Sequence, residues 1–352
     1  MAMQHKKTGV LLVNLGTPDD PNRSAVYRYL KQFLLDRRVI DISWVARNIL
    51  VRGIIAPFRS GSSSKLYKML WTKEGSPIKV YGYALRDKLA VALGKDYVVK
   101  LAMRYQTPSI EDAIRNLLFD EKVDEIVVMP LFPQYASATT GSVHDEVMRV
   151  FRTLDVIPPM TFINSYPTNE KMIQTFAANA RQFDLDAYEH ILFSFHGLPQ
   201  RQLRKGDISK AHCLKVEQCC SVVSDNNKYC YSAQCHQTSF AIANELGLPR
   251  EKYTICFQSR LGKDPWVQPY TSEVIENLQE KGVKSILVFS PAFVADCLET
   301  TIEIGHEYHE EFIKNGGEKL DLVPSLNDND QWVDAVKEMI VAHTLHHNYL
   351  MV

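Results

Sequence analysis

The segment Leu192-Phe193-Ser194-Phe195-His196-Gly197-Leu198-Pro199 joins a short apolar run to a histidine, a glycine and a proline. The apolar residues are typical of a strand, and the glycine and proline are typical of the turn that ends it. Ligands of open α/β sheets bind beyond the carboxyl ends of the strands. A histidine at such a place can move protons or bind a metal at neutral pH, and a structural histidine is the common alternative.

A second strand end with polar neighbours lies further along the chain. Ser290-Pro291-Ala292-Phe293 closes another apolar run, and Asp296, Glu299 and Glu303 follow it. Their spacing of i, i+3 and i+7 places the three carboxylates on one face of an α-helix. A solvated acidic face near a helix start is the alternative. Together with His196, the carboxylates predict a site for a metal ion.

Length and charge narrow the class of protein. The chain has 352 residues, and its net charge is −1. The length predicts two domains, and the balanced charge argues against a nucleic-acid partner. We see no signal peptide and no window near the ~20 apolar residues of a membrane span. We therefore expect a cytoplasmic protein, with at most peripheral contact at the inner face of a membrane.

Strand and helix patterns alternate throughout the chain, which predicts an α/β fold with parallel sheets. Two similarly built domains with a cleft between them are expected, because Met129-Pro130-Leu131-Phe132 resembles Ser290–Phe293 in kind. The expected domains are 1–166 and 167–329, followed by a C-terminal helix in 330–352 that packs back on the first domain. Further strands are expected at 8–15, 98–103, 125–129, 253–258 and 285–289.

The segment 58–77 differs from its surroundings. Its residues Gly61–Ser64 are loop-like, and several large apolar residues follow them. Leu66, Met69, Leu70 and Trp71 are expected to form an exposed lip over a pocket or against a membrane surface. An ordinary connection whose apolar residues join the core is the alternative.

Five of the seven cysteines lie close together in an apparent insertion at 205–235. In a cytosolic protein such a group is more typical of metal binding or redox chemistry than of disulfides. The five residues are Cys213, Cys219, Cys220, Cys230 and Cys235.

Several segments resemble the signature segments of the ferrochelatase family, in the order expected for it and over nearly the whole chain. The resemblance rests on Leu12–Pro18, Arg104-Tyr105, Gln134-Tyr135, Thr139–Ser142, Phe195–Pro199, Phe257–Arg260, Asp264–Trp266 and Asp296–Thr300. It implies two Rossmann-like domains with parallel sheets, as in other chelatases. It also implies insertion of Fe(II) into protoporphyrin IX, which gives protohaem in the last step of haem biosynthesis.

The resemblance also implies roles for single residues. His196 and Glu299 correspond to the catalytic and metal-binding residues, and Asp296 and Glu303 to an acidic path beside them. Four residues match positions that bind the porphyrin: Arg104, Tyr105, Trp266 and Phe293.

The cysteine-rich segment is similar to that of ferrochelatases which carry a [2Fe–2S] cluster on an internal segment. Ser137 stands where another type has an internal cysteine, and the C-terminus lacks cysteines, so a C-terminal cluster is excluded. Five thiols leave the set of four ligands open, and zinc bound by four cysteines is the alternative.

Two other functions stay open at this point. The chain could insert a metal into another tetrapyrrole, such as coproporphyrin III or sirohydrochlorin. It could also be a non-catalytic redox sensor that binds porphyrin or haem.

Overall fold

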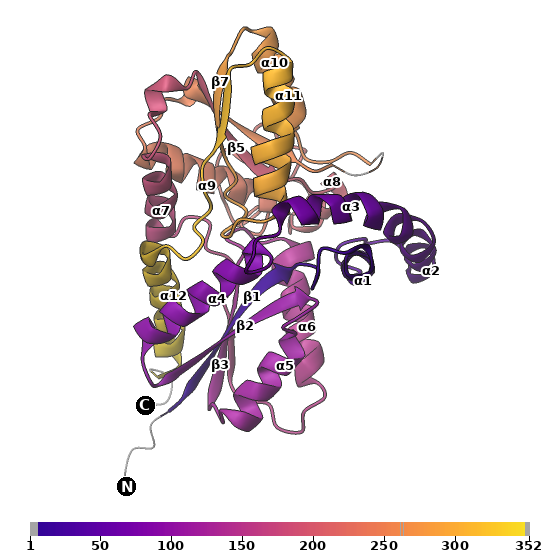
Figure 1. Cartoon of the computed structure of the whole chain (residues 1–352). Coiled ribbons are helices and arrows are strands. Elements are labelled where there is room, and N and C mark those ends of the chain that lie inside the picture. Colours follow the sequence, from indigo (N-terminus) through magenta and orange to yellow (C-terminus); the bar gives the residue numbers. More distant parts are fainter. Residues whose placement is uncertain (1–5, 261, 263, 349–352) are drawn as a thin grey trace. The chain divides into compact units, whose positions relative to one another are not determined.

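The protein is described by a computed structural model of residues 6–260, 262 and 264–348, so the expected helix is described only up to residue 348. The chain forms two compact units, each built on a four-stranded parallel sheet (Figure 1). Within the described residues, the first unit comprises residues up to 132, residues 137–164 and residues from 328 onward. The second comprises 133–136 and 165–327.

The two sheets have the same strand order. In the first unit the order is β2-β1-β3-β4, with β1 Thr8–Gly16, β2 Tyr97–Tyr105, β3 Glu125–Pro130 and β4 Met160–Phe162. In the second it is β6-β5-β7-β8, with β5 His190–His196, β6 Tyr253–Gln258, β7 Ser285–Phe289 and β8 Lys319–Leu322. The predicted α/β class and parallel sheets are therefore confirmed.

Most of the strands that the sequence predicts are buried on both faces, and the edge strand β2 is the partly exposed one. Val10, Leu11, Leu12 and Val13 of β1 have no exposed surface, and the same holds for Ile191–Phe193 of β5. Parallel strands covered by helices on both sides read as continuous apolar runs for this reason. The strands β4 and β8 have only three and four residues, and their sequences carry no comparable signal.

Helices cover the first sheet on both faces. The residues of α5 and α6 pack against Leu11, Val13, Ile126 and Val128, while α12 packs against α4 and β3 (Figure 1). The helices of this unit are α1 Arg23–Leu34, α2 Trp44–Asn48, η1 Ile49–Ile55, α3 Ala56–Leu70, α4 Pro77–Leu93, α5 Ile110–Arg115, η2 Asn116–Asp120, η3 Ser137–Gly141, α6 Ser142–Phe151 and α12 Asp330–Asn348.

Helices also pack against the second sheet. One face packs against α10, the π-helix η6 and α11 through Leu192, Ile286, Val288 and their neighbours. The helices of this unit are α7 Glu170–Ala180, η4 Leu185–Ala187, α8 Gln200–Lys205, α9 Tyr231–Glu245, η5 Arg250–Lys252, α10 Thr271–Glu280, η6 Leu298–Tyr308 and α11 His309–Lys314. Among the described residues, no helix combines the length and hydrophobicity that crossing a bilayer requires.

The prediction of a loop at Gly61–Ser64 is wrong, because these residues lie inside α3. Their small size and their hydroxyls let α3 lie against the α1 region. The hydroxyl of Ser64 donates to the carbonyl of Pro21 at 2.7 Å, and Nε of Arg23 donates to the hydroxyl of Ser60 at 3.3 Å. Packing against a neighbouring helix outweighs the weak helix propensity of glycine and serine.

Candidate active site

His196 lies at the topological switch point of the second sheet. It is the last residue of β5, and it is aligned with Gln258, the last residue of β6. β6 and β7 lie on opposite sides of β5. The order in which strands are added to the sheet therefore reverses at β5, and α/β proteins bind ligands beyond the strand ends at such a point. Residues that follow β7 reach the same edge of the sheet.

The imidazole of His196 is held in one tautomer. Its Nδ1 lies 2.7 Å from the carbonyl oxygen of Gly197. Because a carbonyl oxygen can only accept, Nδ1 carries the hydrogen and Nε2 keeps a lone pair for a proton or a metal. The hydroxyl of Tyr231 donates to the backbone carbonyl of His196 at 2.9 Å and fixes the strand end from the other side.

The glycine after His196 is required by a close approach of two strands. A Cβ atom at Gly197 would lie 2.8 Å from the carbonyl oxygen of Gln258 and 3.2 Å from the ring of Trp266. Any side chain would therefore push β5 and β6 apart or displace the indole. The dipeptide His196-Gly197 thus fixes the place of the imidazole and of the aromatic ring beside it.

Two of the predicted porphyrin-binding residues stand beside His196. The ring centroids of Trp266 and Phe293 each lie 6.5 Å from that of the imidazole. Both side chains are half-buried, so they keep apolar surface toward the solvent side of the strand ends. They form two apolar walls around a group that can accept a proton.

The carboxylates Glu299 and Glu303 lie on the π-helix η6, Leu298–Tyr308. Cys297 caps this helix, and its backbone N–H donates to the hydroxyl of Thr300 at 2.9 Å. The charges of His196 and Glu299 both act on the carboxylate of Glu303. Burial raises the pKa of Glu303, and the hydroxyl of Ser259 and the charge of His196 oppose that rise.

The predicted geometry of the acidic face needs a correction. The spacing argument assumed an α-helix that includes Asp296, but the helix begins after Cys297 and is wound as a π-helix. Asp296 therefore lies outside it and accepts hydrogen bonds from the side chain of Asn327 at 2.7 Å and the backbone of Ser325 at 3.2 Å. These bonds tie the loop after β8 to the strand end, and the place of Asp296 on an acidic path stays a prediction.

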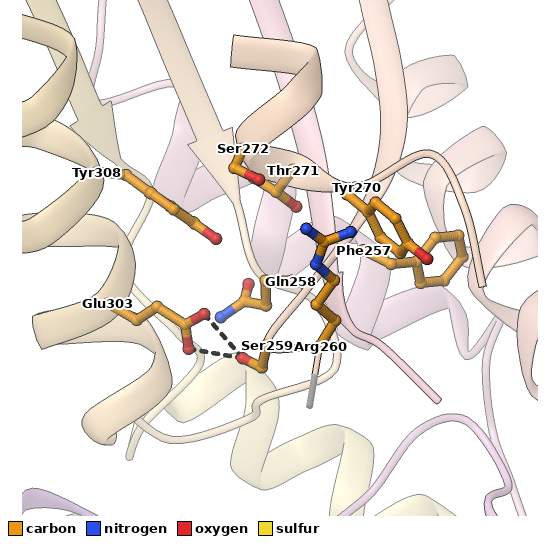
Figure 2. Close-up of a pocket in the computed structure, with 9 residues that line it drawn as sticks. All are labelled: Phe257, Gln258, Ser259, Arg260, Tyr270, Thr271, Ser272, Glu303 and Tyr308. Atoms are coloured by element: carbon orange, nitrogen blue, oxygen red, sulfur yellow. Dashed lines mark hydrogen bonds between the residues drawn. The ribbon is translucent and has the colours of Figure 1, made fainter. Parts of the chain in front are cut away.

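A cavity of about 210 Å³ lies beside Glu303 (Figure 2). Glu303 belongs to its wall, and the charge of His196 also acts on this carboxylate. The cavity is lined by Phe257, Gln258, Ser259, Arg260, Tyr270, Thr271, Ser272, Glu303 and Tyr308.

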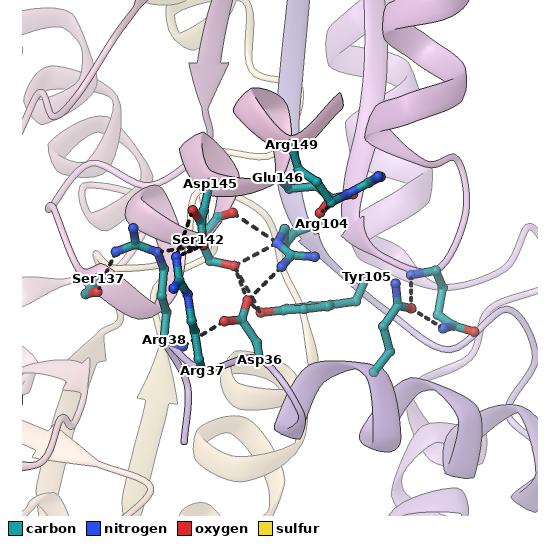
Figure 3. A network of polar contacts seen from close by, with 12 residues as sticks. Asp36, Arg37, Arg38, Arg104, Tyr105, Ser137, Ser142, Asp145, Glu146 and Arg149 are labelled. Carbon is teal, nitrogen blue, oxygen red and sulfur yellow. Dashed lines mark hydrogen bonds and ion pairs between the residues drawn. The ribbon is translucent and has the colours of Figure 1, made fainter. Parts of the chain in front are cut away.

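Arg104 and Tyr105 lie in the first unit, where they belong to a buried polar network around Asp36 (Figure 3). The carboxylate of Asp36 accepts from Nη2 of Arg104 at 2.7 Å, and from the hydroxyls of Tyr105 at 2.9 Å and Ser142 at 2.5 Å. Tyr105 has no exposed surface, and burial raises the pKa of its hydroxyl. Asp36 was not predicted from the sequence, where it is marked only by its position shortly after α1 and before two arginines.

The cysteine-rich segment is organised by two buried polar side chains. The carboxylate of Asp207 accepts from the backbone N–H groups of His212 at 2.9 Å and Cys213 at 2.8 Å. The amide of Asn227 donates to the carbonyls of Cys219 and Val222, both at 2.9 Å. Polar contacts therefore hold the turns that carry the cysteines, in a segment with few buried apolar residues.

Four of the five thiols gather in this segment. The thiol of Cys230 shares hydrogen bonds with those of Cys213 and Cys220, and the Sγ atoms of Cys219 and Cys220 lie 3.8 Å apart. Cys235 is fully buried on α9, where it meets the hydroxyl of Tyr231. In the part of the chain that the structure describes, no three His, Cys, Asp or Glu side chains are already arranged around a metal position.

Comparison with known proteins identifies the family. The model of the family "Ferrochelatase" matches residues 7–344. A ferrochelatase of Legionella pneumophila (strain Lens) is 42% identical over 95% of this chain and 98% of its own. One of Coxiella burnetii (strain CbuK_Q154) is 43% identical over 95% of this chain and 93% of its own.

The fold is shared with solved chelatase structures. SirB from Bacillus subtilis with Fe3+ superposes with a TM-score of 0.52 over 95% of this chain and 94% of that one, at 12% identity. The sirohydrochlorin chelatase SirB from Bacillus subtilis subspecies spizizenii, in complex with cobalt, gives 0.51 over 94% and 92%, also at 12% identity. At this identity the likeness concerns the fold alone. The match of the family model and the two relatives over nearly the full length show that the chain belongs to the ferrochelatase family.

Proposed function

We propose that this protein inserts Fe(II) into protoporphyrin IX in haem biosynthesis, with His196 and Glu299 as its central residues. The observation that carries this proposal is the Nε2 lone pair of His196 beside the acidic π-helix. Family membership supports an enzyme that inserts iron into porphyrin. The geometry adds a proton acceptor, carboxylates for the metal and apolar walls for the ring, all in one unit.

The reaction exchanges one metal ion for two protons. Fe(II) loses water, and the two N–H groups of the porphyrin lose their protons as the four ring nitrogens bind the metal. Nε2 of His196 can accept a proton from the ring, because Nδ1 already carries its own. Glu299 and Glu303 can bind the incoming cation and pass protons to the cavity. Stacking on Trp266 and Phe293 would supply binding energy to bend the ring toward the metal.

Arg104 and Tyr105 would serve the porphyrin in different ways. Arg104 binds Ser142 through Nε and Asp36 through Nη2, and we propose that Nη1 binds a propionate. Tyr105 is fully buried, so its contribution would pass through Arg104 rather than through contact with the ring.

One assay tests the proposed function. Purified protein is mixed with Zn(II) and protoporphyrin IX, and the fluorescence of the zinc porphyrin is followed. We expect turnover with protoporphyrin IX and slower turnover with coproporphyrin III and sirohydrochlorin. Preference for either of these would identify another chelatase, and tight porphyrin binding without turnover would indicate a carrier or sensor.

We also propose that the four gathered thiols hold a [2Fe–2S] cluster. One distance supports this proposal. Two thiolates on one tetrahedral metal with bonds of about 2.3 Å lie about 3.8 Å apart, which is the distance between the Sγ atoms of Cys219 and Cys220. Cys213 and Cys230 supply the other two sulfurs. Such a cluster brings one-electron redox chemistry when bound. Zinc would be satisfied by the same four thiolates.

Replacement of single cysteines tests the ligand set. Cys213→Ser and Cys230→Ser are expected to lose the visible absorption, the iron and the sulfide of anaerobically purified protein. Cys235→Ala is the matched control and should keep all three, because Cys235 contacts Tyr231 and lies outside the four. Stoichiometric zinc without sulfide would establish the zinc alternative, and protein without either metal would contradict the ligand assignment.

We further propose peripheral contact with a membrane, through a different set of residues from the predicted lip. Leu70 is only 5% exposed, so it cannot belong to an exposed lip, whereas Met69 is 53% exposed. The exposed apolar residues instead lie earlier, over α2, η1 and the start of α3. They are Trp44, Val45, Ile49, Ile54 and Phe58.

Charge supports this assignment. The segment 42–73 contains no Asp or Glu and six basic residues. Arg47 is buried, and the other five are exposed: Arg52, Arg59, Lys65, Lys68 and Lys73. Exposed aromatic and aliphatic groups beside lysines and arginines are typical of a surface that lies in the headgroup region of anionic lipids.

The double variant Trp44→Ser/Phe58→Ser is expected to bind anionic vesicles at least several-fold more weakly and to raise the KM for porphyrin supplied in vesicles. Its melting temperature should stay close to that of the wild type, because these side chains are 70% and 78% exposed. Leu70→Ser is the contrasting variant and should mainly lower the melting temperature. Unchanged vesicle binding by the double variant would contradict the proposed surface.

A further inference from the structure

The peptide group between His196 and Gly197 is held from both sides. The N–H of Gly197 donates to the carbonyl of Gln258 at 2.8 Å, and the carbonyl of His196 accepts from the hydroxyl of Tyr231 at 2.9 Å. Glycine has no side chain that would restrict its own backbone rotation. The direction of the next carbonyl, which binds Nδ1 of His196, therefore depends on these two outside contacts.

Tyr231 joins this strand end to the cysteine-rich segment. It is the first residue of α9, directly after the segment's last turn, and its side chain is only 8% exposed. Thiols contact the residues on either side of it. The thiol of Cys230 shares hydrogen bonds with those of Cys213 and Cys220, and Sγ of Cys220 donates to the hydroxyl of Ser232 at 3.2 Å. The gathered thiols therefore hold the turn that carries the Tyr231 hydroxyl.

The cysteine-rich segment has little apolar packing of its own. Among residues 206–229, all of which the structure describes, three are buried: Asp207, Cys213 and Asn227. Three others have a left-handed backbone, with φ of +56°, +58° and +50°: Lys210, Leu214 and Gln218. Such conformations persist only when the surrounding contacts favour them strongly. Here these contacts come from polar groups and thiols rather than from an apolar core.

We propose that Tyr231 is a positioning residue that makes metal insertion depend on the state of the cysteine-rich segment. While the four thiols keep their mutual contacts, the first turn of α9 is fixed and its hydroxyl holds the carbonyl of His196. When these contacts are lost, the turn shifts, the peptide group before Gly197 rotates more freely, and the imidazole loses its single orientation. This proposal rests on the proposed function, because it takes His196 as the proton acceptor.

Tyr231→Phe removes the hydroxyl and keeps the ring. We expect kcat for zinc insertion to fall about 10–100-fold, the loss that a small displacement of a reacting group causes, with the KM for porphyrin unchanged. Tyr188→Phe is the matched control, because this buried tyrosine also loses a hydroxyl contact, with Asp321, before β5 begins. Both variants should melt at similar temperatures, and only Tyr231→Phe should lose activity. A wild-type kcat in Tyr231→Phe would overturn the proposal.

A double-variant cycle tests the link to the cysteine-rich segment. Cys213→Ser breaks the contacts among the thiols and should lower kcat in the otherwise wild-type protein. In the Tyr231→Phe background the same substitution should cause little further loss, because the connection is already cut. Two losses that multiply fully would show that the segment does not act through Tyr231 and would overturn the proposal. An unchanged kcat in Cys213→Ser would do the same.

Nuclear magnetic resonance of nitrogen-labelled histidine separates this proposal from the proposed function. The nitrogen shifts of His196, assigned by their loss in His196→Ala, report which ring nitrogen carries the hydrogen. The wild type and Tyr188→Phe should show Nδ1–H alone. Tyr231→Phe and Cys213→Ser should each show a mixture of the two tautomers, even if the wild type metalates no porphyrin. An unchanged single tautomer in either variant would overturn the proposal even if the wild type is an active chelatase.

Discussion

The variant His196→Ala is expected to lose about 10²–10⁴-fold in the rate of metal insertion, the range typical of a positioned acid–base group. The loss follows from the tautomer: Nδ1 is bound to the carbonyl of Gly197, and Nε2 is the atom that can accept a proton or bind Fe(II). Porphyrin binding should remain, because Trp266 and Phe293 keep their apolar surfaces. Zinc insertion gives the rate, and an absorbance titration gives the porphyrin affinity.

Two other substitutions test whether the loss is specific to this site. Glu299→Gln keeps the shape of the side chain, removes its charge and should reduce turnover nearly as much as His196→Ala. His190→Gln, at the opposite end of β5, serves as the control, because its imidazole contacts Thr254 away from the strand ends of the site. A His196→Ala variant that kept most of its turnover would show that another group removes the protons.

Asp36→Ala is expected to produce the largest loss of stability, about 3–5 kcal/mol. The substitution leaves the guanidinium of Arg104 without the carboxylate that lies 2.7 Å from it, in a place where the two side chains are only 4% and 14% exposed. It also removes the acceptor of two buried hydroxyls. At about 2–4 °C per kcal/mol, the melting temperature of the first unit should fall by roughly 6–20 °C.

Calorimetry of the thermal transition measures this effect, with two comparisons. Arg37→Ala removes an ion pair with Asp145 at a side chain that is 68% exposed, so its effect should stay below about 1 kcal/mol. Asp36→Leu combined with Arg104→Met should be milder than Asp36→Ala, because no buried charge is left unpaired. A fall of less than about 2 °C for Asp36→Ala would mean that water or another acid replaces the carboxylate.

The strands that build the site could be predicted because burial on both faces makes each a continuous apolar run. The same reasoning placed His196 at a strand end, and it could have found Gln258, which is aligned with it on the neighbouring strand. The π-helix could not be found, because the argument from spacing assumed the period of an α-helix. The error also placed Asp296 on a helix that begins only after it.

Contacts between residues far apart in sequence could not be predicted from the sequence. Asp36 and Arg104 are 68 positions apart, and neither carries a local signal of the other. The choice among five cysteines also depended on folded geometry, since Cys235 points to Tyr231 from inside α9. The predicted exposure of Leu70 was wrong and that of Met69 was right, because amphipathic pattern alone does not show which helix face a neighbour covers.

The identical strand order of the two sheets bears on the ancestry of the chain. The likeness extends to single atoms: a Cβ at Gly16 would meet the carbonyl of Tyr105, as one at Gly197 would meet that of Gln258. The residue after each of these carbonyls is left-handed, Gln106 in the first half and Ser259 in the second. Duplication of one ancestral gene, followed by fusion and divergence, produces this pattern. The two turns differ in their contacts: Ser259 donates to the carboxylate of Glu303, whereas the backbone N–H of Gln106 donates to the side chain of Gln32.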